Sequence, residues 1–440
     1  MKKKYLSFIL TLLSLVVFVG CGSKNDANEN KNTDVADLIN NLNKAEENQK
    51  IEEEAKKLAP KEIEASKRAE KSVEEKEVSS KEKKSDIKKV KIKAVGDIMA
   101  HLAQIQYAYN RGGGSYDFSK SFEYVSDFIK DSDLAIGNYE TTTNPNQPYA
   151  GFPRFNSPES FLTAIKDAGF DVVTTANNHS MDTELEGVFS TMDAVEDAGL
   201  SYVGSMRDES EKILTKKING IRIAILAYTY GCNGRENLIV PREEVENLNY
   251  LTDETQVKED IKKAKAQGAD FVIVYPHWGV EYHSYPVDTQ IKLGRNMIEW
   301  GADLVIGNHP HVVEPVELYK AEDGREGLIA YALGNFVSFQ SLENNKDIRV
   351  EQALALEIEL QKDLNSGDKK ISDLSFHPLW VGTTYDDFGR NVQTYLAEDF
   401  LDGGKYYDYV NENQRARIKQ AYDMTLETAN TGVEWWKILK

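Results

Sequence analysis

Five of the seven histidines in the chain follow short apolar segments that are typical of buried strands. These five are His101, His179, His277, His309 and His311. Proteins built of alternating strands and helices gather functional side chains at the carboxyl ends of their strands, so residues far apart in sequence would meet there. One such histidine alone is more often a hydrogen-bonded surface residue, but five together favour a shared site.

Four of the histidines, His101, His277, His309 and His311, suit a metal site together with three oxygen donors. His309-Pro310-His311 places two imidazoles two residues apart, and neutral imidazole binds Zn, Mn, Fe, Ni or Cu. Asp97, Glu140 and Asn178 would add oxygen ligands, enough for two ions that share one carboxylate. No cysteine adjoins the set, which disfavours a structural zinc knuckle. We predict one or two divalent ions, with Mn, Fe or Zn as candidates.

A pair of divalent ions about 3.5–4 Å apart would clamp the oxygens of a phosphoryl or similar group. His179, outside the metal ligands, would then protonate the leaving group. Asp182 lies three residues further on and would either orient His179 or cap a helix. Arg154 has a planar fork that suits phosphate or carboxylate, so it would bind an anionic substrate group or form a surface salt bridge.

Strands and helices alternate in the part of the chain that must position these residues. We expect strands at 90–96, 134–137, 171–175, 201–203, 221–228, 271–275 and 303–306. Helical patterns lie at 119–130, 158–168, 184–198, 254–267 and 287–300. Strands alone are expected at 328–333, 353–360 and 371–379. This order predicts α/β layers around a largely buried sheet.

The net charge of −19 is unevenly distributed along the 440 residues. Residues 21–90 hold 16 basic and 17 acidic side chains and no aromatic residue, and 1–20 contribute three lysines, so 91–440 carry a net charge of −21. A domain so acidic is a poor binder of the nucleic-acid backbone, and we expect no nucleic-acid partner. The charged stretch cannot bury enough apolar surface to fold alone, so we interpret 21–90 as a disordered or partly helical linker.

The first 20 residues are interpreted as a signal peptide. Lys2, Lys3 and Lys4 precede an uncharged run at 5–19, which is short for a transmembrane helix of roughly 20 residues. Phe18-Val19-Gly20-Cys21 resembles a bacterial lipobox, in which Cys21 would carry a lipid. The alternative is an uncleaved signal anchor. Both place the rest of the chain at the outer face of the cytoplasmic membrane, and Cys232 is then a bystander.

Six motifs, taken in order, resemble the CapA family of poly-γ-glutamate capsule proteins over about 91–340. They are Val95-Gly96-Asp97-Ile98-Met99, Asn138-x-Glu140, Ala176-Asn177-Asn178-His179, His277-Trp278-Gly279, His309-Pro310-His311-Val312 and Leu333-Gly334-Asn335-Phe336. That family is similar to calcineurin-like metallophosphoesterases. The resemblance implies a four-layer α/β/β/α sandwich with a dinuclear site over 91–340. A C-terminal β-strand and helical extension, 341–440, would pack on the same domain.

The resemblance also implies roles for individual residues. Asp97 matches the first aspartate, Glu140 the bridging carboxylate, Asn178-His179 the Asn-His pair, His277 the lone histidine, and His309 with His311 the final pair. Met99 stands where those enzymes have a histidine, so the first metal loses a ligand unless His101 replaces it. Glu140 is one methylene longer than the usual aspartate, and Asn308 widens the Gly-His spacing by one residue.

The function implied is that of an extracytoplasmic, membrane-anchored lipoprotein for capsule synthesis, export or attachment. It would act on an anionic polymer or another phosphate- or carboxylate-bearing substrate, beside the subunits of a membrane synthesis complex. One alternative is a stand-alone metal-dependent phosphoesterase or amidohydrolase acting on a cell-surface polymer. Another is a non-catalytic polymer-binding module, against which the cost of burying imidazoles and carboxylates without a metal argues.

Overall fold

A computed structural model describes residues 85–238 and 247–433. The signal peptide, Cys21 and most of the charged linker predicted from the sequence lie outside the described residues. Among the residues that are described, no helix is long and apolar enough to cross a membrane.

Eight strands form the first sheet, in the order β14-β13-β12-β1-β2-β3-β4, with β11 also beside β1. The parallel part consists of β1 (Ile87–Ile98), β2 (Leu134–Tyr139), β3 (Val172–Thr174), β4 (Ser201–Val203) and β11 (Asn335–Val337). The antiparallel part consists of β12 (Gln352–Asp363), β13 (Lys369–Asp386) and β14 (Gly389–Leu396). Strands formed by residues beyond 340 therefore share a sheet with β1.

Six strands form the second sheet, in the order β5-β6-β7-β8-β10-β9. They are β5 (Leu214–Ile218), β6 (Ile221–Thr229), β7 (Phe271–His277), β8 (Leu304–Ile306), β9 (Val316–Lys320) and β10 (Glu326–Ala330). The four inner strands run parallel, and the two edge strands are antiparallel to their neighbours. The inner strands are apolar on both faces because each face is covered by another layer.

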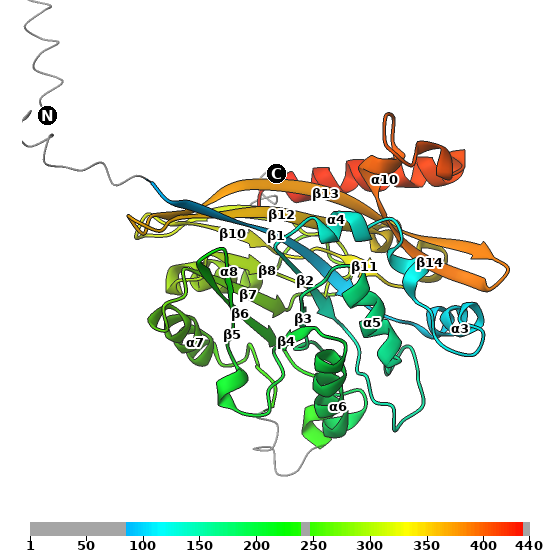
Figure 1. Cartoon of the computed structure of the whole chain (residues 1–440), viewed down its shortest axis with the longest axis horizontal. Coiled ribbons are helices and arrows are strands. Elements are labelled where there is room, and N and C mark those ends of the chain that lie inside the picture. The colour runs from blue at the N-terminus through cyan, green and yellow to red at the C-terminus, as the bar shows by residue number, and fades with distance from the viewer. Residues whose placement is uncertain (1–84, 239–246, 434–440) are drawn as a thin grey trace, which may run out of the picture. The chain divides into compact units, whose positions relative to one another are not determined.

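The two sheets pack on each other, and helices cover both outer faces (Figure 1). Between the sheets, Ile92 and Ile136 of the first sheet join Ile223 and Ile273 of the second in one buried core. The first sheet is covered by α3 (Leu102–Arg111), α4 (Ser126–Lys130), α5 (Glu159–Asp167) and α6 (Glu184–Asp197). The second is covered by α7 (Glu254–Ala266) and α8 (Asp288–Trp300). This arrangement confirms the predicted four-layer α/β/β/α sandwich.

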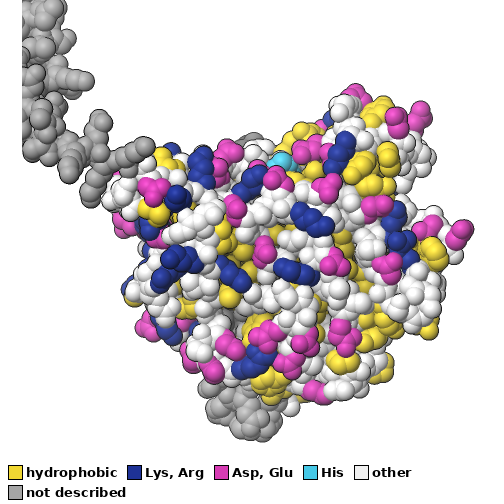
Figure 2. All heavy atoms as spheres, in the orientation of Figure 1, with side chains coloured by type: hydrophobic (Ala, Val, Ile, Leu, Met, Phe, Trp, Pro, Cys, Tyr) yellow, Lys and Arg dark blue, Asp and Glu magenta, His cyan; other side chains and the backbone are white. Residues whose placement is uncertain are grey.

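The last helix, α10 (Glu412–Asn430), packs on the C-terminal strands. Its Ile418 and Ala421 contact a cluster built from Trp380, Tyr395 and Phe400. The short elements are α9 (Leu342–Asn345) and the 3-10 turns η1 (Ser119–Phe122), η2 (Glu209–Glu211), η3 (Arg235–Leu238), η5 (Ile348–Glu351), η6 (Ala397–Phe400) and η7 (Tyr407–Tyr409). On the face shown in Figure 2, basic and acidic side chains are interspersed, and neither sign gathers into a broad patch of described residues.

Two expected elements differ from those observed. The helix expected at 119–130 is a 3-10 turn followed by the short α4, with Glu123, Tyr124 and Val125 between them. The strand expected at 371–379 covers only the first part of β13, which pairs first with β12 and then, as far as Asp386, with β14. The part that was not predicted includes the buried Trp380 and Val381 and continues into the polar, exposed end of the strand at Asp386.

Candidate metal centre

The carboxyl ends of strands from both sheets meet at one edge of the sandwich. On the first sheet, Asp97 lies next to the last residue of β1, Glu140 follows β2 directly, and the turn after β3 carries Asn178 and His179. On the second sheet, His277 ends β7, and the loop after β8 carries His309 and His311. The convergence predicted from the strand-end histidines is therefore present.

Glu140 belongs to two overlapping groups of candidate metal ligands. One group is Glu140, His277 and His309, and the other is Asp97, Glu140 and His311. Within each group the potential ligand atoms lie within 4.8 Å of one another, and all five residues are buried. Glu140 Oε1 lies 3.7 Å from Nε2 of His277 and also 3.7 Å from Nε2 of His311. The carboxylate expected to be shared is placed between the two groups.

Two atoms of these groups are buried without a hydrogen-bond partner among the described residues. They are Glu140 Oε1 and His309 Nδ1. A buried polar atom left unpaired costs free energy, typically about 1–3 kcal/mol, and a charged one costs more. A cation bound between the groups would satisfy both atoms, so the residues present fit a divalent metal.

Burial and mutual proximity shift the pKa values of the ligand groups. Burial, followed by repulsion from Asp97, raises the pKa of Glu140 well above its usual value. Burial would also raise the pKa of Asp97, but hydrogen bonds from His311 and Asn138 lower it overall. Burial and neighbouring imidazoles lower the pKa of His277, and burial lowers that of His309 to about 3. Both imidazoles are thus held neutral, which is the form that binds metals.

The loop after β8 is held in an unusual backbone conformation. His309 has φ 104° and His311 has φ 58°, in the left-handed region that non-glycine residues rarely adopt. Gly307 begins the loop with its backbone so close to Tyr331 that a Cβ would lie 1.8 Å from the Tyr331 carbonyl oxygen. Asn308 then exchanges backbone hydrogen bonds with Pro276 and Trp278 at the end of β7. Strained residues persist where their surroundings fix them, often at functional sites.

Asn138 was not singled out from the sequence, although it stands in the Asn138-x-Glu140 motif. Its Nδ2 donates to Asp97 Oδ1 at 2.8 Å and lies 3.3 Å from Glu140 Oε2. Its Oδ1 accepts from Thr174 Oγ1 at 3.0 Å, which fixes the orientation of the amide. Asn138 therefore holds both carboxylates of the centre in place.

His179 and Asp182 form the expected pair. His179 Nδ1 lies 2.7 Å from Asp182 Oδ2, which also accepts from the backbone N–H of Phe155 at 2.6 Å. The N-cap of α6 is Thr183 and not Asp182, so the carboxylate orients His179 and does not cap the helix. His179 lies outside both ligand groups, as the proton-donor role requires.

Asn178 and His101 were both predicted as ligands and are placed differently. Asn178 Oδ1 lies 3.0 Å from His277 Nε2, directly beside one ligand group. His101 belongs to neither group, and its Nε2 lies 3.3 Å from Ser338 Oγ. Its ring meets the Phe155 ring edge-on, with centroids 4.9 Å apart. The structure does not bring His101 into the position left vacant by Met99.

Arg154 forms the salt bridge that was its alternative interpretation. Its Nη2 pairs with Glu184 at 3.1 Å, and its Nε donates to the carbonyl of Asp182 at 2.8 Å. Arg235, which was not singled out from the sequence, donates to the carbonyl of Met181 at 2.9 Å and pairs with the same Glu184. Both arginines thus hold the segment that follows His179 in place, and the expected anion-binding role of Arg154 stays a prediction.

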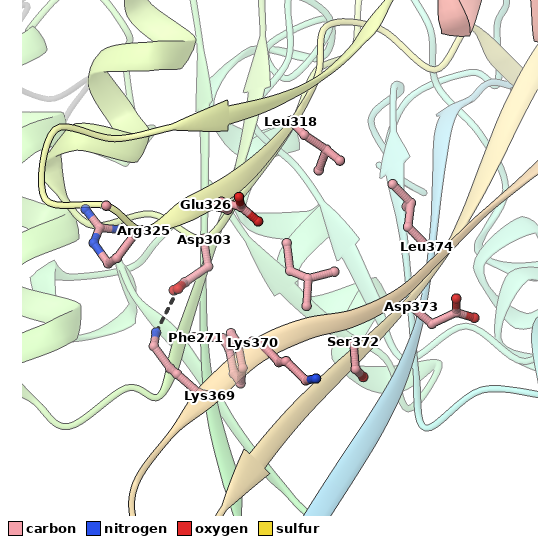
Figure 3. Close-up of a pocket in the computed structure, with 12 residues that line it drawn as sticks. Phe271, Asp303, Leu318, Arg325, Glu326, Lys369, Lys370, Ser372, Asp373 and Leu374 are labelled. Atoms are coloured by element: carbon pink, nitrogen blue, oxygen red, sulfur yellow. Dashed lines mark hydrogen bonds and ion pairs between the residues drawn. The ribbon is translucent and has the colours of Figure 1, made fainter. Parts of the chain in front are cut away.

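A cavity of about 530 Å³ lies at the amino ends of β7 and β8, away from the carboxyl ends that carry the candidate ligands (Figure 3). Phe271 begins β7, and Asp303 immediately precedes β8. Lys369 of β13 reaches across to Asp303, with Nζ 2.7 Å from Oδ1.

Comparison with known proteins identifies the family. Residues 91–340 match the family described as "Bacterial capsule synthesis protein PGA_cap". The chain belongs to this family. It is 33% identical over 277 residues to the capsule biosynthesis protein CapA of Bacillus anthracis, covering 60% of this chain and 64% of that protein. It is 32% identical over 268 residues to the PGA biosynthesis protein CapA of Bacillus subtilis (strain 168), covering 59% and 66%. The chain thus spans just under two thirds of the length of these relatives.

Among solved structures, the calcineurin-like phosphoesterase YfkN from Bacillus subtilis aligns with a TM-score of 0.41 at 14% identity. That alignment covers 77% of this chain and 98% of the other.

Proposed function

We propose that this chain acts at the outer face of the cytoplasmic membrane in the synthesis, export or attachment of a poly-γ-glutamate-type capsule polymer. It would be held there by a lipid on Cys21 or by an uncleaved signal anchor. Membership of the capsule synthesis family and the names of the two CapA relatives support the biological role. The partners would be an anionic polymer and the membrane complex that makes it.

The proposed activity at this location is metal-dependent hydrolysis. The observation that carries it is Glu140 Oε1, buried, unpaired and equidistant from two imidazole nitrogens. Asp97, Glu140 and His311 would hold one divalent ion, and Glu140, His277 and His309 the other. When bound, two such ions supply a clamp for anionic oxygens and an activated water.

Residues around the ligands would do the remaining chemistry. Asn138 keeps both carboxylates oriented through its amide. With Nδ1 of His179 engaged by Asp182, Nε2 is the ring nitrogen left to give a proton to the leaving group. The negative charge of the domain would steer an anionic substrate away from most of the surface and toward the cations.

The test uses the full chain, extracted from membranes and reconstituted with Mn²⁺. We expect close to two ions per chain by elemental analysis, together with hydrolysis of bis(p-nitrophenyl) phosphate that chelation abolishes and Mn²⁺ restores. A chain that retains no Mn, Fe or Zn after reconstitution would rule out the enzymatic proposal. Labelling with radioactive palmitate tests the anchor, because a lipoprotein loses the label in Cys21→Ala.

A further inference from the structure

A cavity of about 350 Å³ lies beside the candidate metal ligands and is walled by aromatic rings. His179 and His311 line it on the side of the metal centre. Phe155 packs edge-on against His179, with ring centroids 4.7 Å apart, and Phe152 and Phe339 complete the apolar wall. Ligand pockets span about 300–1,000 Å³, so this one lies at the small end of that range and has room for one substituent next to the reacting centre.

The described residues that line this pocket carry no positively charged lysine or arginine side chain. Their one carboxylate is that of Glu281. The other polar lining residues include the neutral amides Gln340, Asn344 and Asn345. A second negative charge on a substrate would find no cation here and would be repelled by Glu281.

Arginines on the surrounding segments are already engaged. Arg154 pairs with Glu184, and Arg349 pairs with Asp347 at 2.6 Å. The guanidinium of Arg390 lies 4.1 Å from the centroid of the Phe339 ring. None of these groups lines the pocket, so anion recognition is left to the metal centre alone.

We propose that this pocket receives the uncharged ester substituent of a phosphodiester, so that the site prefers phosphodiesters to phosphomonoesters. The inference rests on the proposed hydrolase function and names its substrate class. A diester carries one negative charge, which the metal centre would hold, and a second ester group that needs an uncharged space. A monoester carries close to two charges at neutral pH, since its second pKa is about 6.

The reaction is a balanced hydrolysis. The oxygen of water forms a new bond to phosphorus, and the phosphorus–oxygen bond to one alcohol breaks. That alcohol takes its proton from His179, and the proton released by the water replaces it. The products are one alcohol and one phosphomonoester that still carries a proton on its new P–OH group. At neutral pH that group loses its proton to solvent, and the monoester then carries the second charge that the pocket disfavours, which favours its release.

The test compares bis(p-nitrophenyl) phosphate with p-nitrophenyl phosphate on the full chain loaded with Mn²⁺. We expect kcat/KM to be at least about tenfold higher for the diester.

Phe152→Ala removes a ring that is 75% exposed and should reduce this preference several-fold through KM. Asn344→Lys adds a cation to the pocket and should shift the preference toward the monoester. Tyr409→Ala, which removes a 68% exposed ring elsewhere, is the matched control and should leave the preference unchanged.

Equal or better turnover of the monoester would overturn the proposal. Absence of turnover with both esters would count against the hydrolase function, and the pocket is then tested by binding. Calorimetry with diphenyl phosphate and phenyl phosphate should show tighter binding of the diester to the Mn²⁺-loaded chain. Tighter binding of phenyl phosphate, or binding of neither, would overturn the inference.

Discussion

The two ends of β7 and β8 both bury charged side chains between the sheets, but in opposite ways. At the amino ends, around the cavity in Figure 3, the two aspartates that directly precede the strands have cationic partners: Lys369 and Lys265 lie near Asp303, and Lys362 pairs with Asp270. Asp303 also accepts from the backbone N–H of Val272 at 2.8 Å. At the carboxyl ends, Glu140 faces His277, whose imidazole is held neutral by burial, and Glu140 Oε1 has no hydrogen-bond partner among the described residues.

The ion pair between Lys369 and Asp303 connects the two sheets, whereas Glu140 is placed to bind a ligand. A matched ion pair needs nothing further, whereas a buried carboxylate without a partner is stable only if something else compensates it. The comparison predicts that substitutions at the carboxyl ends change metal content and turnover, and that substitutions at the amino ends change only stability.

Glu140→Gln should have the largest effect. The substitution keeps the size of the side chain but removes the charge that both ligand groups share, so metal content should fall from about two ions per chain to below one. Turnover should fall about 10⁴-fold, because several kcal/mol of charge stabilisation are lost at about tenfold per 1.4 kcal/mol. Elemental analysis and bis(p-nitrophenyl) phosphate hydrolysis measure the two effects. Retention of both ions would show that Glu140 is not shared.

His179→Ala should have the next largest effect. It separates proton donation from metal binding at the carboxyl ends of the strands. Loss of a general acid typically lowers turnover by about 10²–10⁴-fold, while the metal content should stay unchanged because His179 belongs to neither ligand group. Asp182→Asn should lower turnover less, since it keeps a side chain that can hold Nδ1. A loss of metal in His179→Ala would move this residue into the ligand set.

Lys369→Met tests the amino ends of the strands. The Lys369 side chain is 24% exposed and Asp303 8%, so the pair lies between a surface and a buried one, and its loss should cost about 1–2 kcal/mol of unfolding free energy. Urea denaturation of the chelated protein measures this cost, with Lys419→Met, from an exposed helical pair, as the control that should change little. Any change in metal content would contradict the division between the two ends.

Sequence patterns located the site because its ligands follow buried strands, and parallel strands present their carboxyl ends together. The four-layer fold followed from the strand and helix order together with the family motifs. The length of β13 and the presence of helix α3 were harder to predict from the sequence. The far end of β13 is polar and exposed, and α3 has the polar Gln104 within its buried face, which breaks the apolar pattern of a helix.

Contacts that depend on loop conformation could not be predicted. Arg154 could have pointed into the site or away from it, and only the path of residues 181–184 decides that it pairs with Glu184. Arg235 joins the same clamp from a segment more than 50 residues later in the chain. The hub position of Asn138 depends on three strands being in register, with Asp97 opposite Asn138 and Asn138 opposite Thr174.

Glu314 provides the finest test of the comparison, because it resembles Glu140 in its burial and its unpaired oxygen but belongs to neither ligand group. It is fully buried, its Oε2 accepts from Gln290 at 2.9 Å, and its Oε1 is unpaired among the described residues. Neither candidate ligand group contains it. Burial raises its pKa to about 8 from an ordinary value of 4.5.

Between these two pH values the folded chain keeps a proton on Glu314 that the unfolded chain has lost, so stability falls as the pH rises through that window. In Glu314→Gln that contribution disappears, and the unfolding free energy of the chelated protein should decline by about 1–3 kcal/mol less between pH 5 and pH 8. Metal content should remain at the level of the unsubstituted chain, since no imidazole shares this carboxylate. If Glu314→Gln lost metal as Glu140→Gln is expected to, an unpaired buried oxygen would be enough to identify a metal ligand. The imidazoles around Glu140 would then not be what distinguishes Glu140 from Glu314.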